Sequence, residues 1–254
     1  MIKKILKGFI LQLQFLTRMP LPVHLRFDER VFAGGVVFAP LIGLFIGAVS
    51  AGMYLIAAGI LGSRSLAVLI ALTAEIAATG GLHLDGLADA CDGLFSSRDR
   101  EGILAIMKDS RLGTNGAVAL IILILGKFLM IAAVPDSDII KCLLIMPVLS
   151  RMTVAWSAGI SPYAGKSREG PAPGLIGHIG VAGIVLTTII SMAISMLFFK
   201  FRAVILAMII IAFTLLVNFY AKKKIGGITG DIIGAVIETS EAVFLLAVLV
   251  MEKV

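Results

Sequence analysis

Charged residues are scarce in this chain: they make up 15% of its 254 residues, whereas 59% are hydrophobic. An average soluble domain carries roughly 25% charged residues, and a mean hydropathy of +1.06 is far too apolar for a water-exposed surface of this size. The composition excludes a soluble globular protein. Because the apolar runs are long and continuous, without the alternation of β-barrel strands, we predict an all-α integral membrane protein.

Cysteine is nearly absent as well, and internal repeats are lacking. Cys91 and Cys142 form no CxxC or Cys/His cluster, so neither a zinc site nor a disulfide framework is indicated. No linker or low-complexity tract divides the sequence, which predicts one membrane-embedded domain over residues 1–254. The net charge of +6 does not indicate nucleic acid, because the basic residues stand at the ends of apolar runs, where they contact lipid headgroups.

Seven segments have enough apolar residues to cross a bilayer, which takes about 20 residues in a helix. They are residues 32–60, 66–82, 114–134, 139–160, 176–199, 203–220 and 232–250. The second is short, and the first contains glycines and a proline that favour a break, so six to eight spans fit the pattern. Residues 1–16 place three lysines among apolar residues at helical spacing, with no cleavage site after them. This pattern predicts an amphipathic helix on the membrane surface rather than a signal peptide.

The basic residues are distributed unevenly among the connections between the spans. Most of them lie in four segments, which are residues 1–31, 83–113, 161–175 and 221–231. The other connections hold few, apart from Lys200 and Arg202. Since cytoplasmic connections are enriched in Lys and Arg, we expect the N-terminus and these four segments on the cytoplasmic side of the cell (inner) membrane.

Three carboxylates follow the second span at regular spacing: Asp85, Asp89 and Asp92 stand at positions i, i+4 and i+7. On a helix they share one face, and like charges so close to a low-dielectric medium need cations. Hard carboxylate oxygens favour Mg²⁺, Mn²⁺ or Ca²⁺, and Mg²⁺ commonly shares its ligands with substrate phosphates. We therefore predict a divalent-metal site here, with a solvated helix face as the alternative.

Basic residues follow this acidic segment in the sequence. Lys108 and Arg111 lie about one helical turn apart and can hold a phosphate, with Asp109 between them as a fourth carboxylate. The turn at residues 113–116 opens the third span, where the free amides of a helix N-terminus can bind an anion. A helix cap in a positively charged loop is the alternative. Carboxylates beside basic residues favour phosphoryl transfer, in which a metal neutralises charge and cations position the oxyanions.

Several polar residues lie apart from these two segments. Glu75 and Arg151 stand inside predicted spans, where a charge is costly and therefore a functional candidate. Asp231 opens the last span, and Glu238 follows it on the same helical face. Asp231 alone would be explained as an ordinary helix cap, but a cap does not need the second carboxylate. The candidate metal ligands are thus Asp85, Asp89, Asp92, Asp231, Glu238 and Glu75. The candidate phosphate-binding residues are Lys108, Arg111, Arg151, Lys166 and Arg168.

The motifs of this chain resemble those of the cobalamin synthase family, also called adenosylcobinamide-GDP ribazoletransferases or cobalamin-5′-phosphate synthases. The four main motifs are GGLHLDGLADACDGLF at 80–95, IMKDSRLGTNG at 106–116, SPYAGKSREG at 161–170 and GGITGDIIGAVIE at 226–238. QFLTRMPLP at 14–22 resembles the family as well. The resemblance runs in order along nearly the whole chain, and the HLDGLAD block is highly specific.

This resemblance implies a Mg²⁺-dependent transferase at the inner face of the cell membrane. It would join adenosylcobinamide-GDP to α-ribazole, or to its 5′-phosphate, and release GMP. The acidic motif of the family would be carried by Asp85, Asp89 and Asp92. Judged by residue type, His83 or Asp109 is the candidate general base that accepts the proton of the attacking hydroxyl. The expected partners are these small molecules and the lipid bilayer, with no nucleic acid, and a homo-oligomer is left open.

Two other functions fit parts of the sequence. The CDP-alcohol phosphatidyltransferases also use an acidic helix motif that begins like DGLA at residues 85–88, but Asp89 stands where their motif has Arg. A secondary transporter would explain the charges inside the spans. Transport predicts inverted repeats and polar groups near the midplane, whereas this sequence has no repeat and its polar motifs gather at one face.

Overall fold

The structure is a computed structural model that describes residues 2–165 and 170–253. Its elements are α1 (Ile2–Leu16), α2 (Glu29–Gly34), the 3₁₀ helix η1 (Gly35–Phe38), α3 (Ala39–Leu61), α4 (Arg64–Thr79), α5 (Leu82–Leu94), α6 (Arg100–Ile106), α7 (Thr114–Ala133), α8 (Asp136–Ile160), α9 (Pro171–Leu175), α10 (Val181–Phe199), α11 (Arg202–Ile225) and α12 (Gly230–Met251). The candidate phosphate-binding residues Lys166 and Arg168 lie outside the described residues.

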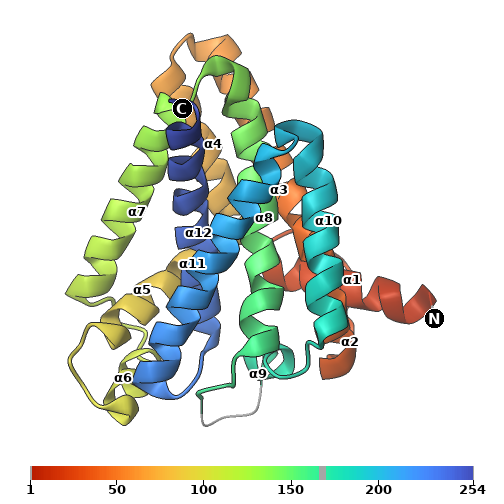
Figure 1. The fold of residues 1–254 in the computed structure, drawn as a ribbon, viewed down its shortest axis with the longest axis vertical. Coiled ribbons are helices and arrows are strands. Elements are labelled where there is room, and N and C mark those ends of the chain that lie inside the picture. Colours follow the sequence, from red (N-terminus) through yellow and green to blue (C-terminus); the bar gives the residue numbers. More distant parts are fainter. Residues whose placement is uncertain (1, 166–169, 254) are drawn as a thin grey trace.

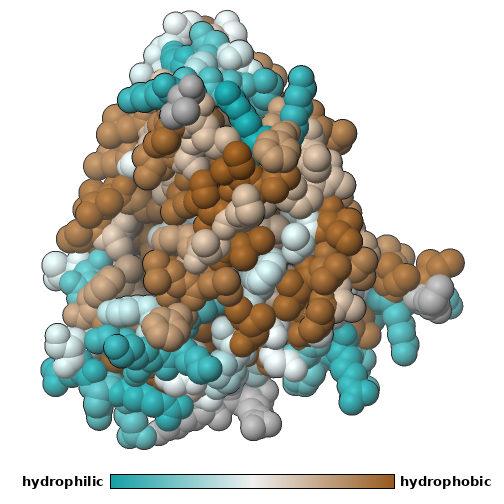
Figure 2. Space-filling model, in the orientation of Figure 1, coloured by the Kyte–Doolittle hydropathy of each residue, from teal (hydrophilic) through white to brown (hydrophobic). Residues whose placement is uncertain are grey.

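The long helices form a bundle between two polar ends. In the described chain, six helical segments are long and apolar enough to cross a membrane: α2–η1–α3, α7, α8, α10, α11 and α12. The pair α4 and α5 would make a seventh span, although it is bent by 87° at the break between the two helices. Figure 1 shows the long helices side by side, and Figure 2 shows an apolar belt between two hydrophilic ends. The predicted all-α polytopic membrane fold is confirmed.

Two details of the spans show how glycine shapes them. The break predicted in the first span is present as η1, between α2 and α3. The fifth span begins at Val181, later than predicted, because α9 and a turn at Gly177 occupy the preceding residues. Gly177 has a φ of +86°, which a residue with a side chain rarely adopts and which ends the helical path there.

Helix α1 runs across the bundle rather than along it (Figure 1). Its first turns expose Ile2, Ile5 and Leu6, whereas its second half is buried against α2 and η1. The side-chain amide of the buried Gln12 donates a hydrogen bond to the carbonyl oxygen of Phe32 at 2.8 Å. A helix with lysines and an exposed apolar face, lying across the spans, has the form of an interfacial helix.

Helices α8 and α12 occupy the centre of the bundle. Of the apolar stretch that would cross the membrane, 78% is buried inside the protein in α8 and 72% in α12. The corresponding share is 22% in both α7 and α10. The outer helices therefore present most of their surface to lipid, while α8 and α12 contact mainly protein. A polar side chain on either central helix must find its partner inside the bundle.

Three polar loops at the lower end of the bundle are bonded to one another. The backbone amides of Ala164 and Ile228 donate to the carbonyl oxygens of Ile228 and Pro162, each at 2.9 Å. The guanidinium of Arg100 donates to the carbonyl oxygens of Ile225 at 2.7 Å and Ala164 at 3.1 Å. Segments that are far apart in the sequence therefore meet at one end, as the distribution of polar motifs predicts.

Candidate active site

The acidic segment is directed across the lower end of the bundle by two adjacent glycines. Gly80 and Gly81 have φ values of +64° and +71°, and they separate α4 from α5. A β-carbon on Gly80 would lie 2.3 Å from the Cγ atom of Arg18, so a side chain there would displace that of Arg18. The backbone amide of Arg18 donates to the carbonyl oxygen of Ala78 at 2.8 Å. The segment after α1 is thereby held to the end of α4, directly before α5 begins.

Helix α5 crosses α12 with almost no space between the backbones. A β-carbon on Gly86 would lie 3.1 Å from the Cα atom of Asp231, and one on Gly234 would lie 3.2 Å from the carbonyl oxygen of His83. A cavity of about 170 Å³ opens at this crossing, and His83, Asp85 and Asp231 are among its lining residues. The crossing therefore brings Asp231 to the acidic segment, as predicted.

A second cavity, of about 380 Å³, shares Asp85 with the first. Its lining includes Arg18, Gly81, Asp85, Ala88 and Leu112, so it lies between the end of α1, the acidic helix and the loop before α7. Arg18 is exposed and places a cation next to the acidic segment. Sequence reasoning treated this residue as a topology signal only. The motif QFLTRMPLP at 14–22 was the signal that could have placed it in the site.

Asp92 connects the acidic helix to the loop that follows it. Its two carboxylate oxygens accept hydrogen bonds from the backbone amides of Gly113 at 2.7 Å and Gly116 at 2.8 Å, at the start of α7. A β-carbon on Gly113 would lie 2.4 Å from a carboxylate oxygen of Asp92, which explains the glycine there. The predicted anion site at this helix N-terminus is occupied by a carboxylate of the protein itself.

Lys108, Asp109 and Arg111 lie on the loop that Asp92 anchors. The Nε atom of Arg111 donates to both carboxylate oxygens of Asp109, each at 3.0 Å. These hydrogen bonds hold the pKa of Asp109 below its ordinary value. Lys108 is exposed and has no ion pair within the described residues. Lys108 is therefore the cation of this loop that remains free for a ligand, since Arg111 already has a carboxylate partner.

The acidic segment carries negative charge that no ion pair of the described residues neutralises. The carboxylate of Asp89 lies in the electrostatic field of Asp85, Asp92 and Asp231. Within the described residues, none of these four forms an ion pair with Lys or Arg. Such a cluster favours the binding of a cation.

The donor atoms of this cluster fit Mg²⁺, although the site is not preformed. No three His, Cys, Asp or Glu side chains of the described chain are close enough together to hold a metal ion by themselves. Mg²⁺ is usually bound by one or two carboxylates and completes its shell with water and substrate phosphates rather than with an all-protein cage. Asp85 and Asp89, one turn apart on the open face of α5, provide two such carboxylates.

Glu75, Glu238 and Arg151 are placed elsewhere, in a network buried inside the bundle. Lys127 on α7 contacts Glu75 at 3.3 Å and Glu238 at 3.4 Å, and it also pairs with Glu241. Arg151 on α8 forms an ion pair with the same Glu241. All five side chains are nearly or fully inaccessible.

This buried network changes the interpretation of three candidate residues. Glu75 and Glu238, which we predicted as metal ligands, neutralise Lys127, and Arg151, which we predicted to bind phosphate, neutralises Glu241. None of the three lines either cavity at Asp85. Sequence reasoning missed Lys127 and Glu241, although both are charged residues inside apolar runs and carried the same signal as Glu75.

His83 differs from the other candidates because it is buried and has no partner. Its side chain is 3% exposed, and neither ring nitrogen has a hydrogen-bond partner within the described residues. It lines the cavity that also contains Asp85 and Asp231. A buried imidazole without a partner is unusual, and at this place it is available to a ligand that enters the cavity.

Comparison with known proteins identifies the family of the chain. A model of the cobalamin-5-phosphate synthase family matches residues 8–249. The chain belongs to this family. A protein of Clostridium novyi named adenosylcobinamide-GDP ribazoletransferase is 37% identical over 246 residues, which cover 96% of this chain and 97% of that protein. Proteins of the same name are 37% identical in Acetivibrio thermocellus, over 96% of this chain and 97% of theirs, and in Clostridium botulinum, over 98% and 100%. No solved structure matches the chain.

The family match covers every motif that the structure brings to the lower end of the bundle. Residues 8–249 include the end of α1, the acidic helix, the loop before α7 and the start of α12. The cavities at Asp85 are therefore built from segments that all lie inside the matched region.

Proposed function

We propose that this protein is an enzyme of the final stage of cobalamin biosynthesis, which joins adenosylcobinamide-GDP to α-ribazole or its 5′-phosphate. The observation that carries the proposal is the near-full-length match to adenosylcobinamide-GDP ribazoletransferases, at 37% identity over 96% of the chain. The uncompensated carboxylates at the crossing of α5 and α12 support it, because the reaction acts on a pyrophosphate.

The reaction is a substitution at phosphorus. A hydroxyl oxygen of the ribazole attacks the phosphorus atom that carries the cobinamide. The bond from this phosphorus to the bridging oxygen breaks, the electron pair leaves with GMP, and the hydroxyl proton passes to a base. The protein must therefore hold the pyrophosphate, neutralise the charge that develops on GMP and accept one proton.

Asp85 and Asp89 are the residues that would hold Mg²⁺, with Asp231 beside them. When bound, Mg²⁺ would neutralise negative charge on the pyrophosphate and on the leaving GMP. Arg18 lines the cavity next to Asp85 and would contact the phosphates directly. Asp92 has a positioning role, because its bonds to Gly113 and Gly116 fix the basic loop beside α5.

His83 is the residue that would accept the proton. It lies in the cavity at the crossing, and its ring nitrogens are not engaged by the protein. Asp109 is the weaker candidate because it lines neither cavity at Asp85 and its carboxylate is already bonded to Arg111.

We place this site on the cytoplasmic side of the cell membrane. The loops that surround it carry most of the basic residues of the connections, and cytoplasmic connections are enriched in Lys and Arg. GDP-activated and ribazole-type substrates are water-soluble, so the exposed position of Asp85 at the end of the bundle suits their access.

The direct test is GMP release by the purified protein in liposomes that contain adenosylcobinamide-GDP, α-ribazole and Mg²⁺. We expect turnover that EDTA abolishes and Mg²⁺ restores, and a loss of at least about 100-fold in Asp85→Asn and Asp89→Asn. Asp136→Asn, at the opposite end of the bundle, is the matched control and retains activity. Turnover with a CDP-activated lipid and none with the corrinoid would contradict the proposal.

A further inference from the structure

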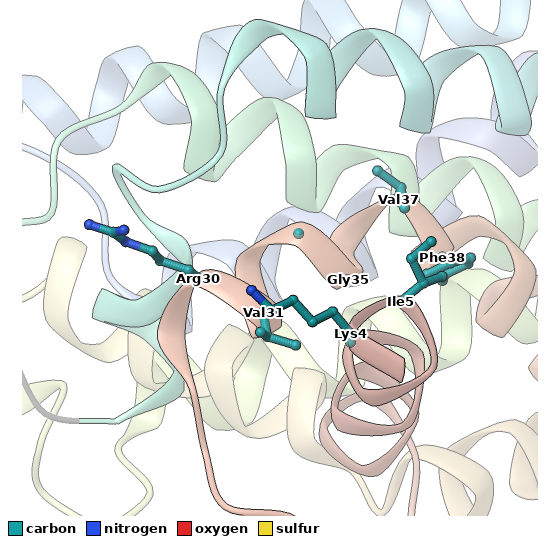
Figure 3. A pocket seen from close by; sticks show the side chains of 9 residues that line it. Lys4, Ile5, Arg30, Val31, Gly35, Val37 and Phe38 are labelled. Atoms are coloured by element: carbon teal, nitrogen blue, oxygen red, sulfur yellow. The ribbon is translucent and has the colours of Figure 1, made fainter. Parts of the chain in front are cut away.

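A groove of about 390 Å³ lies between α1 and the α2–η1 segment (Figure 3). Its lining residues are Lys4, Ile5, Gly8, Arg30, Val31, Gly34, Gly35, Val37 and Phe38. None of them lines the two cavities at Asp85. The groove is therefore a separate feature of the molecule, and the proposed reaction leaves it without a role.

The shape of the groove is fixed by contacts between backbones. A β-carbon on Gly35 would lie 2.4 Å from the carbonyl oxygen of Gly8, and one on Gly8 would lie 2.9 Å from the carbonyl oxygen of Val31. The rings of Phe9 and Phe38 meet edge to face at 5.5 Å between centroids. Helix α1 is thus held at a set distance from η1, and the groove does not depend on mobile surface side chains.

The groove has a cationic part and an apolar part. Figure 3 shows Arg30 at one end, the amino group of Lys4 near Val31, and Val37 and Phe38 toward the other end. Lys4 and Arg30 are exposed and form no ion pair within the described residues. An occupant that matches both parts must carry an anionic group and an apolar chain.

The position of the groove supplies such a molecule. Helix α1 lies across the bundle, its exposed Ile2, Ile5 and Leu6 need an apolar environment, and the groove lies at the start of the span α2–η1–α3. An interfacial helix of this kind lies at the boundary between lipid headgroups and acyl chains. Two unpaired cations there attract a headgroup with net negative charge more strongly than a zwitterionic one.

We propose that this groove binds an anionic phospholipid, with its phosphate at Lys4 and Arg30 and an acyl chain along Ile5, Val37 and Phe38. The lipid holds α1 against η1. Because α1 leads to Arg18 in the site described above, we expect bound lipid also to raise turnover, and that second effect alone rests on the proposed function. Binding itself is measured without substrates, so the two proposals fail separately.

The test is native mass spectrometry of the full chain released from nanodiscs of mixed phosphatidylglycerol and phosphatidylcholine. The unchanged protein is expected to retain phosphatidylglycerol selectively. Lys4→Gln/Arg30→Gln should weaken this retention about tenfold or more, and Lys4→Arg/Arg30→Lys should preserve it. Lys222→Gln/Lys223→Gln is the matched control, since it removes the same charge from an exposed basic cluster outside the groove.

A second variant blocks the groove without changing its charge. Gly34 lines the groove, and a β-carbon there meets no atom within 4 Å, so Gly34→Leu fills the space without a backbone clash. We expect it to lose the lipid, whereas Gly52→Leu, at an equally open position on α3, keeps it. Equal retention of both lipids by the unchanged protein, or retention by Gly34→Leu, overturns the proposal. So does an equal loss in the Lys222/Lys223 control.

Discussion

Asp92 on α5 accepts a hydrogen bond from the backbone amide of Gly113 at 2.7 Å, and its second oxygen accepts one from Gly116 at 2.8 Å. The carboxylate thus caps α7 from a helix that lies 21 residues earlier in the sequence. Two acidic residues of the same helical face, Asp85 and Asp89, have no such bonds within the described residues. One acidic motif therefore contains residues of two kinds, an anchor and two open carboxylates.

The first prediction separates these two roles by their dependence on Mg²⁺. Asp92→Asn keeps one acceptor oxygen and should lower kcat, while the Mg²⁺ concentration for half-maximal activity stays within about twofold. Asp85→Asn and Asp89→Asn should raise that concentration about tenfold or more, because they remove ligand oxygens. Asp92→Ala loses both bonds and should also destabilise the protein by about 1–2 kcal/mol. A Mg²⁺ requirement in Asp92→Asn as high as in Asp89→Asn would make Asp92 a ligand.

The second prediction concerns the buried network around Lys127. Lys127→Met leaves Glu75, Glu238 and Glu241 without their shared cation, and removal of one partner from a buried ion pair costs about 3–5 kcal/mol. We expect a corresponding loss of thermal stability in detergent. Adding Glu75→Gln should restore part of it, because the double variant removes one charge of each sign.

An exposed ion pair provides the control for this measurement. Arg64 pairs with Asp136 at the opposite end, and the side chain of Asp136 is 86% exposed. Asp136→Asn should therefore cost less than about 1 kcal/mol. If Lys127→Met proved as harmless as Asp136→Asn, the network would contribute nothing to stability.

The third prediction tests Arg18 as a phosphate contact. Arg18→Gln should raise the KM for adenosylcobinamide-GDP about tenfold or more, since one charge-assisted contact to phosphate is lost. The KM for ribazole should change little. Arg18→Lys should recover part of the loss, because a lysine keeps the charge without the two-pronged geometry. Arg26→Gln, a neighbouring exposed arginine outside both cavities, serves as the control.

The long helices were predictable because each is a continuous apolar run, and a bilayer requires such a run of about 20 residues. The break at η1 was predictable from its glycines and proline. The direction of α5 was not, because the 87° bend depends on Gly80 and Gly81 both adopting positive φ values, which glycine permits but does not require.

The sequence also predicted that its polar motifs meet at one end, and it identified Asp231 as a neighbour of the acidic segment. It could not assign the partners of Glu75 and Arg151. A charge inside a span marks either a functional site or a buried ion pair, and the choice depends on which helices are adjacent. Lys127 lies 52 residues after Glu75, so only the packing of α4 against α7 reveals the pair.

The fourth prediction distinguishes His83 from Asp109 by the pH dependence of the rate. Arg111 lowers the pKa of Asp109, so this carboxyl is ionised at every pH above its ordinary range and does not titrate where the enzyme is assayed. Asp109→Asn should therefore leave the shape of the profile unchanged. His83 acts as a base only when neutral, and its burial without a hydrogen-bond partner disfavours the charged imidazolium, so activity should persist at pH values below the ordinary titration range of histidine.

His83→Gln should reduce kcat by about 100-fold to 10,000-fold, the usual contribution of a general base, at every pH of the profile, whereas Asp109→Asn should not. A near-normal kcat in His83→Gln would assign the proton transfer to another group. His83 packs closely against α12: a β-carbon on Gly234 would lie 3.2 Å from the carbonyl oxygen of His83. A substitution at His83 can therefore disturb the structure, and circular dichroism and binding of GMP distinguish lost chemistry from lost structure. A glutamine that folds and binds GMP normally, yet does not turn over, would show that the imidazole itself is needed.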